Sequence, residues 1–277
     1  MRFDIVTIFP GFFQGFLENG IIRRAQAEGL ISFGLHDLRN WTHDRHRTVD
    51  DRPFGGGEGM VLKPEPLSAA LESLGVEPKP KQTPAHSSPP HVVLLSAQGR
   101  PFTQVIARNF AKLERIVLVC GRYEGVDERI NQLYCDTEIS IGDYILSGGE
   151  LAAAVVADAV MRLVPGVLGN EASGEFESFG AADTEIATVT EGVPRSQHGA
   201  GGLLDYPHYT RPAEFMGLAV PEVLQKGDHA AIRRWRREQQ LRKTFANRPD
   251  LLEKAALSAE DLKTIAVLKE RHSDGQG

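Results

Sequence analysis

The sequence has little cysteine and none of the common phosphate-binding motifs. Its 277 residues include two cysteines, Cys120 and Cys135, with no CxxC pair and no second cluster. A disulfide framework and a structural zinc site are therefore not supported, and a reducing compartment fits. No GxGxxG occurs, and no glycine precedes a lysine as a P-loop requires, which excludes the usual loops for dinucleotides and nucleoside triphosphates.

Long hydrophobic runs are also missing. The N-terminal stretch MRFDIVTIF is interrupted by Asp4 and followed by Pro10, before the core of a signal peptide could form. The apolar stretch from Leu151 is broken by Asp158 and Arg162, well short of a membrane span. We therefore expect a cytoplasmic protein with neither export nor membrane anchoring.

The chain lacks an overall basic charge, but its basic residues are clustered. A net charge of -6 argues mildly against generic nucleic-acid binding. One cluster comprises Arg233, Arg234, Arg236, Arg237, Arg242, Lys243 and Arg248, opposed only by Asp228 and Glu238. The other comprises Arg39, His43, Arg45, His46, Arg47 and Arg52. Each cluster suits an RNA contact or, equally, a solvated helix face or loop.

The apolar pattern predicts an α/β fold with a parallel sheet. Four β-branched runs predict strands at 3–9, 92–96, 115–120 and 137–141. Helix-like stretches occur at about 12–28, 65–74, 102–113, 126–133 and 150–163. This alternation is typical of parallel α/β sheets, whose apolar strands are covered on both faces.

The composition along the chain divides it into three parts. The segment 77–91 is a Pro-rich connector, and 180–201 is rich in Gly, Ala, Thr and Ser with no apolar period. A predominantly helical tail begins at about 219. We therefore predict an α/β domain over 1–168, a flexible linker over 169–203 and a helical domain over 204–277.

Three predicted strands end in glycine-containing loops, namely SAQGRP, GRYEG and GDYILSGG. Ligands of open parallel sheets bind beyond the carboxyl ends of the strands, so these loops outline one crevice. In the third loop, Ser147 and Glu150 have the spacing of a helix capping box. The apolar residues Tyr144, Ile145 and Leu146 instead suit a flat, uncharged ring such as adenine. A phosphate-free adenosyl ligand indicates S-adenosylmethionine.

Six blocks of sequence resemble the bacterial tRNA (guanine-N1)-methyltransferases, the TrmD family, in the same order along nearly the whole chain. They are THDRHRTVDDRPFGGGEGM (42–60), LVCGRYEGVDERI (118–130), SIGDYILSGGE (140–150), PGVLGNEAS (165–173), LLDYPHYTRP (203–212) and HAAIRRWR (229–236). The chain departs from that family at Glu58, where many members have proline, and in a longer stretch at about 180–201.

The resemblance implies a SPOUT fold, in which the α/β domain carries a deep trefoil knot and a small helical C-terminal domain binds tRNA. It also implies an obligate homodimer with active sites between the subunits. The implied reaction is methyl transfer from S-adenosylmethionine to N1 of the guanine at nucleotide 37 of tRNA, next to the anticodon. The family is associated with magnesium, but no carboxylate cage for Mg²⁺ is evident in the sequence.

The resemblance also assigns roles to residues. The matched S-adenosylmethionine contacts are Gly121, Ile141, Gly142, Asp143, Tyr144, Ile145 and Leu146, with Leu95 and Ser96 lining the same pocket. Arg162 matches the arginine that acts on the guanine. Glu177 stands where the family's general base, usually aspartate, is found.

Each catalytic assignment has a structural alternative. Arg162 has the i,i+4 spacing of an ion pair with Asp158, and Glu177 could be a solvated linker carboxylate with Glu175 as its rival. Trp235 could stack on a base or pack in a core. A related knotted methyltransferase acting on ribosomal RNA or a ribose hydroxyl, and a catalytically silent RNA-binding protein, are the rival functions.

Overall fold

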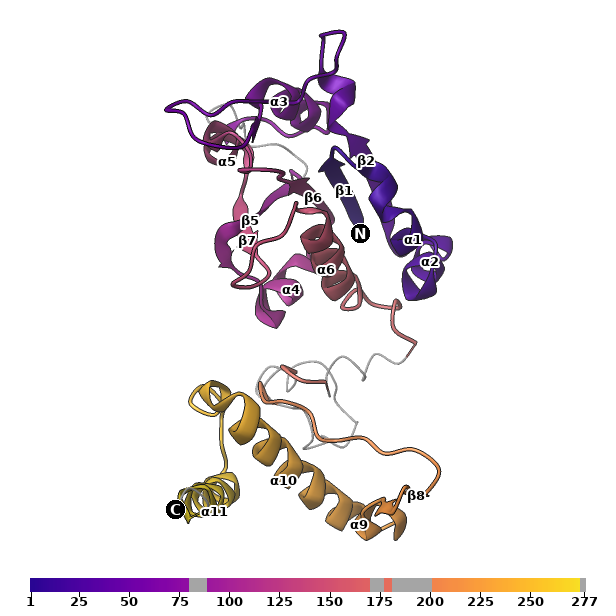
Figure 1. Ribbon diagram of the computed structural model, residues 1–277. Helices are drawn as coiled ribbons and strands as arrows, with labels where there is room; N and C mark the ends of the chain where they lie inside the picture. Colours follow the sequence, from indigo (N-terminus) through magenta and orange to yellow (C-terminus); the bar gives the residue numbers. More distant parts are fainter. Residues whose placement is uncertain (80–88, 170–176, 181–200, 275–277) are drawn as a thin grey trace. The chain divides into compact units, whose positions relative to one another are not determined.

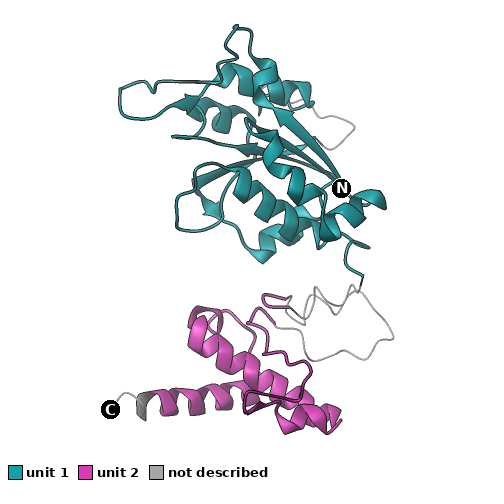
Figure 2. Ribbon diagram, turned by 45° about the vertical axis from the view of Figure 1, so that its right-hand side comes forward, with its two compact units in different colours: residues 1–169 teal, residues 170–277 magenta. Residues whose placement is uncertain are grey.

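The computed structural model describes residues 1–79, 89–169, 177–180 and 201–274 (Figure 1). The chain forms two compact units, Met1–Gly169 (unit 1) and Asn170–Gly277 (unit 2) (Figure 2). Most of the predicted linker, including the stretch 181–200 and Glu175, lies outside the described residues. The division into three functional parts therefore stays a prediction.

Unit 1 is built on a five-stranded parallel sheet of order β2-β1-β6-β5-β7. The strands are β1 (Arg2–Thr7), β2 (Ser32–Asp37), β5 (His91–Pro101), β6 (Arg115–Cys120) and β7 (Thr137–Ser140). The predicted α/β class with a parallel sheet is confirmed. The strand β2 is not among the four predicted strands, because its sequence SFGLHD mixes a glycine, a histidine and an acid with few apolar residues.

The helices of unit 1 mostly begin and end near their predicted positions. They are α3 (Pro64–Ser73), α4 (Gln104–Phe110), α5 (Glu128–Tyr134) and α6 (Glu150–Met161). The single helix predicted over 12–28 is wrong, since the structure has η1 (Pro10–Phe13), α1 (Gln14–Leu17) and α2 (Gly20–Ala27) there. The break lies between Leu17 and Gly20, and the φ of Gly20, +62°, is in the left-handed region, which interrupts a right-handed helix.

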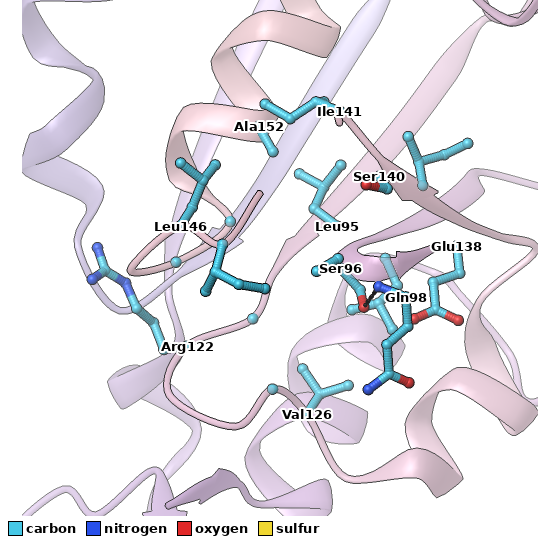
Figure 3. A pocket seen from close by; sticks show the side chains of 18 of the residues that line it. Leu95, Ser96, Gln98, Arg122, Val126, Glu138, Ser140, Ile141, Leu146 and Ala152 are labelled. Carbon is cyan, nitrogen blue, oxygen red and sulfur yellow. Dashed lines mark hydrogen bonds between the residues drawn. The ribbon is translucent and has the colours of Figure 1, made fainter. Parts of the chain in front are cut away.

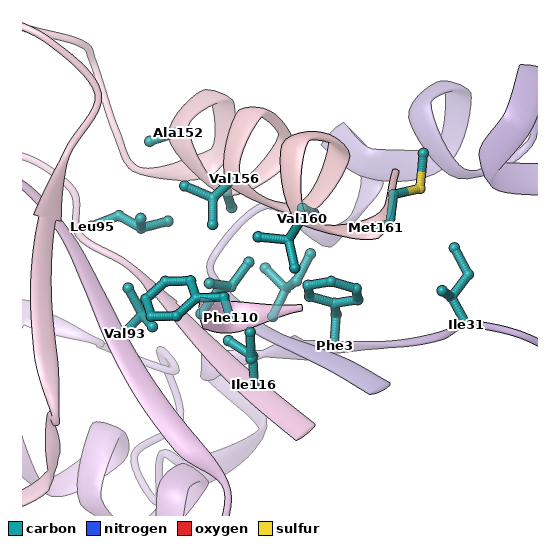
Figure 4. Close-up of a cluster of buried hydrophobic side chains, with 14 of the residues drawn as sticks. Phe3, Ile31, Val93, Leu95, Phe110, Ile116, Ala152, Val156, Val160 and Met161 are labelled. Carbon is teal, nitrogen blue, oxygen red and sulfur yellow. The ribbon is translucent and has the colours of Figure 1, made fainter. Parts of the chain in front are cut away.

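Apolar clusters cover both faces of the sheet. On one face, Val156 and Val160 of α6 pack over Phe3 and Val93 of the strands (Figure 4). On the other face, Leu67 of α3 and its neighbours pack against the sheet with residues of α5. Each fully buried aliphatic or aromatic side chain contributes about 1.5 to 3 kcal/mol. The two-sided burial explains why the predicted strands are apolar at consecutive positions.

Three short elements lie between β2 and α3. The turn η2 (Leu38–Trp41) follows β2, and β3 (Asp50–Asp51) pairs antiparallel with β4 (Val61–Leu62). Between these two short strands the chain is exposed, and Phe54 is fully exposed. Of the first basic cluster, only Arg52 lies in this stretch, and the other members lie in η2 and in the segment between η2 and β3.

Unit 2 consists mainly of helices. It contains the hairpin β8 (Glu214–Phe215) and β9 (Leu218–Ala219), and then α9 (Glu222–Gln225), α10 (His229–Asn247), η4 (Pro249–Leu251) and α11 (Ala259–Asp274). Asp228 caps α10 by accepting from the backbone N–H groups of Ala230 and Ala231. Leu203, Leu241 and Ile265 form a small buried core.

Candidate functional site

A cavity of about 310 Å³ lies at the carboxyl ends of β5, β6 and β7 (Figure 3). Its lining comes from the middle of β5, the loop after β6, β7 and the segment after it, and the first turn of α6. The three glycine-containing loops that the sequence places in one crevice do line this one cavity. Its position agrees with the rule that ligands of parallel sheets bind at the carboxyl ends of strands.

The loop from β5 is a bulge inside the strand. Pairing with β7 shifts between Leu95 and Arg100, so the residues between them leave the ladder. Ser96 Oγ accepts from the backbone N–H of Gln98 at 3.0 Å, and both side chains lie at the cavity (Figure 3). Gly99 is required by packing, because a Cβ atom there would collide with the backbone of Ile139.

Backbone hydrogen bonds fix the loop that follows β6. The N–H of Glu124 donates to the carbonyl of Met60, and the carbonyl of Gly125 accepts from the N–H of Leu62 at 3.0 Å. On the other side, the carbonyl of Gly121 accepts from the N–H of Gly149 at 2.8 Å. This loop is therefore tied both to the β4 region and to the start of α6.

The segment that follows β7 supplies most of the apolar wall. Ile141 and Leu146 lie with Leu95 and Ala152 around one part of the cavity (Figure 3). The ring of Tyr144 folds back over Gly142, where a Cβ atom would collide with it, and the hydroxyl donates to the carbonyl of Ile141 at 3.3 Å. Such a wall suits a flat ring read by backbone groups.

The structure brings together nearly all of the predicted donor-binding residues. Those lining the cavity are Leu95, Ser96, Gly121, Ile141, Gly142, Tyr144, Ile145 and Leu146. Asp143 is not among the residues that line it. Contact with a methyl donor stays a prediction for all nine of these residues.

Gln98, Val126 and Glu138 also line the cavity, although no sequence pattern singled them out. Gln98 lies within the glycine-containing loop SAQGRP, and Val126 directly follows the loop GRYEG. These positions were the sequence feature that could have identified the two residues. Glu138 lies on β7 opposite Leu94, and its carboxylate accepts from Asn131 Nδ2 at 3.0 Å. The register of β7, which sets its orientation, is not visible in the sequence.

The predicted capping box at Ser147 and Glu150 is wrong. The N-cap of α6 is Gly149, with no side-chain cap hydrogen bond. Glu150 instead turns inward, where its buried carboxylate accepts from Thr7 Oγ1 at 2.7 Å. Here α6 begins close to the end of β6, since a Cβ atom on Gly149 would lie 2.7 Å from the Cα atom of Cys120.

The two predicted catalytic residues belong to different units. Arg162 follows α6 directly in unit 1, and its backbone N–H donates to the carbonyl of Asp158 at 3.3 Å. Glu177 belongs to unit 2, next to Ser178, whose Oγ accepts from the N–H of Asp205 at 2.9 Å. Because the two residues lie in different units, their joint role stays a prediction.

Several arginines of the second basic cluster form ion pairs within unit 2. Arg237 pairs with Asp261 at 2.8 Å, and Arg242 pairs with Glu238 at 2.6 Å. Trp235 is half-buried, with its ring 6.2 Å from that of Tyr209. Arg233 and Arg234 are exposed on the first turns of α10 and are better placed for an external anion.

The described residues include neither a cluster of metal ligands nor a membrane-spanning helix. No group of three or more His, Cys, Asp or Glu side chains in the described ranges could hold a metal ion. Magnesium therefore stays an expectation of the resemblance alone. In the same ranges, every helix is too short or too polar to cross a membrane.

Comparison with known proteins gives a consistent result over the whole chain. Residues 1–254 match the family model described as tRNA (Guanine-1)-methyltransferase TrmD. A tRNA (guanine-N(1)-)-methyltransferase of Koribacter versatilis is 57% identical over 269 residues, covering 97% of this chain and 98% of that protein. Proteins of the same name from Chloroflexus aggregans and Geobacter metallireducens are 50% and 46% identical, with coverage of at least 97% of each chain.

Proposed function

The chain belongs to the tRNA (guanine-1)-methyltransferase TrmD family, and from this membership we propose that it transfers a methyl group to N1 of the guanine at nucleotide 37 of tRNA. The methyl donor is S-adenosylmethionine. The observation that carries the proposal is the cavity at the carboxyl ends of β5, β6 and β7, whose lining includes the matched donor-binding residues apart from Asp143.

The lining fits this donor better than it fits a nucleotide with phosphates. Leu95, Ile141 and Leu146 offer an apolar wall for the adenine ring, and the carboxylates of Glu124 and Glu138 line the same cavity. Carboxylates attract the positive sulfonium and ammonium groups and repel phosphates. The basic side chain in the lining, Arg122, lies 2.9 Å from the carboxylate of Glu150. When bound there, S-adenosylmethionine supplies an activated methyl group.

The chain's own residues supply the remaining chemistry. Guanine N1 carries a proton and is a poor nucleophile until that proton leaves, so Glu177 is assigned as the general base. Negative charge then develops on the guanine O6, where the guanidinium of Arg162 stabilises it. Holding both substrates in line lowers the barrier further by proximity.

We assign donor binding and catalysis to an α/β domain over 1–168, with Glu177 supplied by the linker over 169–203, and tRNA binding to the helical domain over 204–277. Arg233 and Arg234 on α10 would contact phosphates and so position the tRNA without reading its sequence. The target guanine leaves the base stack to enter the site. A location in the cytoplasm, where tRNA is modified, is consistent with this role.

We also propose the trefoil knot of the SPOUT fold. The support is a crossing in unit 1, since β5 lies between β6 and β7 in the sheet. After β7 the chain nevertheless returns to the end of β6, where the N–H of Gly149 donates to the carbonyl of Gly121. The segment between β7 and α6 therefore crosses over β5. Such a crossing is needed for a chain to form a knot.

The homodimer is proposed on the same family basis. The outer face of α6 is compatible with it, because Leu151 and Val155 are about half-exposed at i,i+4 spacing. Ile145, beside the cavity, is 84% exposed. Leu151 and Val155 are neighbours on α6, and adjacent exposed apolar side chains suit a contact with another molecule.

Labelled S-adenosylmethionine and two tRNA transcripts test the function. One transcript carries guanosine at nucleotide 37, and the other is identical except for adenosine there. We expect label in the first alone, recovered as N1-methylguanosine after digestion. Label in the adenosine transcript would instead support a related methyltransferase of different specificity. Donor binding without label in either transcript would support the catalytically silent RNA-binding protein.

A further inference from the structure

A buried carboxylate beside the cavity has no part in the proposed chemistry. Glu150 is 1% exposed and begins α6. One carboxylate oxygen accepts from Thr7 Oγ1 at 2.7 Å, and Oε2 lies 2.9 Å from Nε of Arg122. The second contact is Coulombic, because neither of its atoms has a hydrogen-bond partner among the described residues. The free-energy cost of removing two charges from water often exceeds their mutual attraction. A contribution to stability alone therefore does not explain this pair.

Arg122 connects three segments of the chain. It stands in the loop after β6, and its Nη1 donates to the carbonyl of Ser147 at 3.1 Å. Its guanidinium lies over the ring of Phe9, 4.5 Å from the centroid, just beyond β1. Its backbone also forms an isolated antiparallel bridge with Gly148. A single side chain thus joins the end of β1, the loop after β6 and the segment that leads into α6.

The two glycines before Glu150 are required by this arrangement. A Cβ atom on Gly148 would collide with the side chain of Arg122 and would lie 2.6 Å from Oε2 of Glu150. A Cβ atom on Gly149 would lie 2.7 Å from the Cα atom of Cys120. The SGGE stretch is therefore shaped around the Arg122 side chain and the end of β6, and not around a helix cap.

We propose that Arg122 and Glu150 act together as a latch that holds the segment 140–149 in its cavity-lining conformation, and that they are positioning residues for the methyl donor. This inference rests on the proposed function. Arg122 and Gly148 themselves line the cavity, as do residues on either side of the segment. Without the latch, the segment keeps the Gly149 to Gly121 hydrogen bond but loses the ties at Ser147 and Glu150.

The test compares Arg122→Gln with a matched control, Arg115→Gln. Arg115 is also an arginine that pairs with a buried acid, Asp4, but it is at the start of β6 and does not line the cavity. We expect Arg122→Gln to raise the Kd for S-adenosylmethionine about tenfold or more by calorimetry. Hydrogen exchange should accelerate in residues 140–149 while β1 and β6 keep their protection. Arg115→Gln should lower the melting temperature and leave the Kd unchanged.

Two further variants separate positioning from stability. Arg122→Lys keeps the charge near Glu150 and should recover part of the donor affinity. The double variant Arg122→Gln with Glu150→Gln leaves no unpaired buried charge, so it should melt closer to the wild type than Arg122→Gln does. Its donor affinity should nevertheless stay low.

The outcomes distinguish this inference from the proposed function. If the wild-type protein does not bind S-adenosylmethionine, the proposed function fails. If the wild type binds it and the folded double variant binds it equally well, the latch is refuted while the function stands. Uniformly faster exchange across the whole sheet in Arg122→Gln would also refute the latch, because it would show a general structural role.

Discussion

The Nε atom of Arg115 on β6 donates to Oδ2 of Asp4 on the adjacent strand β1 at 2.7 Å. Asp4 has no exposed surface, and its carboxylate also accepts from Arg2 at 2.9 Å and contacts Nε2 of His36 at 2.7 Å. Gly34 pairs opposite Asp4 on β2, where a Cβ atom would collide with the carboxylate. A buried acid thus joins three neighbouring strands through basic side chains.

Asp4→Asn should destabilise unit 1 strongly. Removing one partner of a buried ion pair leaves the others uncompensated and costs about 3 to 5 kcal/mol. For a unit of this size, that corresponds to a fall in Tm of roughly 6 to 20 °C. Thermal unfolding followed by circular dichroism at neutral pH measures it. An unchanged Tm would mean that the basic side chains turn to solvent without loss.

The difference in Tm between the wild type and Asp4→Asn should depend on pH. Burial alone raises the pKa of Asp4, but the hydrogen bonds from His36, Arg2 and Arg115 outweigh it and hold that pKa well below its usual range. Because the pKa of Asp4 is lower in the folded protein than in the unfolded chain, where it is about 3.9, the ionised carboxylate stabilises the fold at pH values above 3.9. This stabilisation is lost as the pH falls from there through the folded-state pKa. The difference in Tm between wild type and Asp4→Asn should therefore narrow below about pH 4.

The sequence predicted the class of fold because periodicity reports which side chains are buried. The strands β1, β5, β6 and β7 are apolar runs covered on both faces, and such runs are visible without a structure. The strand β2 is an edge strand whose partly exposed residues include Gly34 and His36. His36 contacts the carboxylate of Asp4, and Gly34 leaves room for it. These contacts join distant parts of the chain, so no local sequence pattern predicts them.

The candidate site was predictable to a similar extent. Glycine after a strand marks a loop at the carboxyl edge, so the three loops could be assigned to one crevice. The role of Glu150 could not, because the same spacing fits a capping box as well as an inward ion pair. The choice between them depends on Thr7 and Arg122, which reach Glu150 only in the folded chain.

Gly149→Ala should weaken both stability and donor binding. Its Cβ atom would lie 2.7 Å from Cα of Cys120, so the start of α6 has to move away from β6. Overpacking of this kind costs about 1 to 3 kcal/mol. Thermal unfolding and calorimetry with S-adenosylmethionine measure the two effects. Gly15→Ala in α1 is the control, because a Cβ atom there has no neighbour within 4 Å, and both quantities should stay unchanged or improve slightly.

The arginines on α10 should fall into two groups, one that binds tRNA and one that stabilises unit 2. Arg233 and Arg234 are exposed, so the double variant to alanine should weaken tRNA binding and reduce its salt dependence while Tm is unchanged. Each lost phosphate contact lowers the slope of log K against log salt by about 0.7 to 0.9. Arg237→Ala should instead lower Tm, because Arg237 pairs with buried Asp261. Equal loss of affinity in all of these variants would contradict this division.

Glu177→Gln tests the assignment of the general base. Glutamine keeps the shape of the side chain but cannot accept the N1 proton, so single-turnover methylation should fall about 10² to 10⁴-fold. Binding of tRNA and of S-adenosylmethionine should change little, since the carboxylate acts on the proton and not on either substrate's position. Glu175→Gln is the matched control, because the sequence alone could not choose between the two acids, and it should methylate at the wild-type rate.

Glu177→Asp gives the complementary result. The family usually has aspartate at this position, so the shorter arm should support methylation within about tenfold of the wild-type rate, a difference of about 1.4 kcal/mol in the barrier. Restoring a carboxylate at either length then distinguishes proton abstraction from packing, because packing would favour glutamine over aspartate. Undiminished methylation by Glu177→Gln together with a loss in Glu175→Gln would transfer the role of base to Glu175.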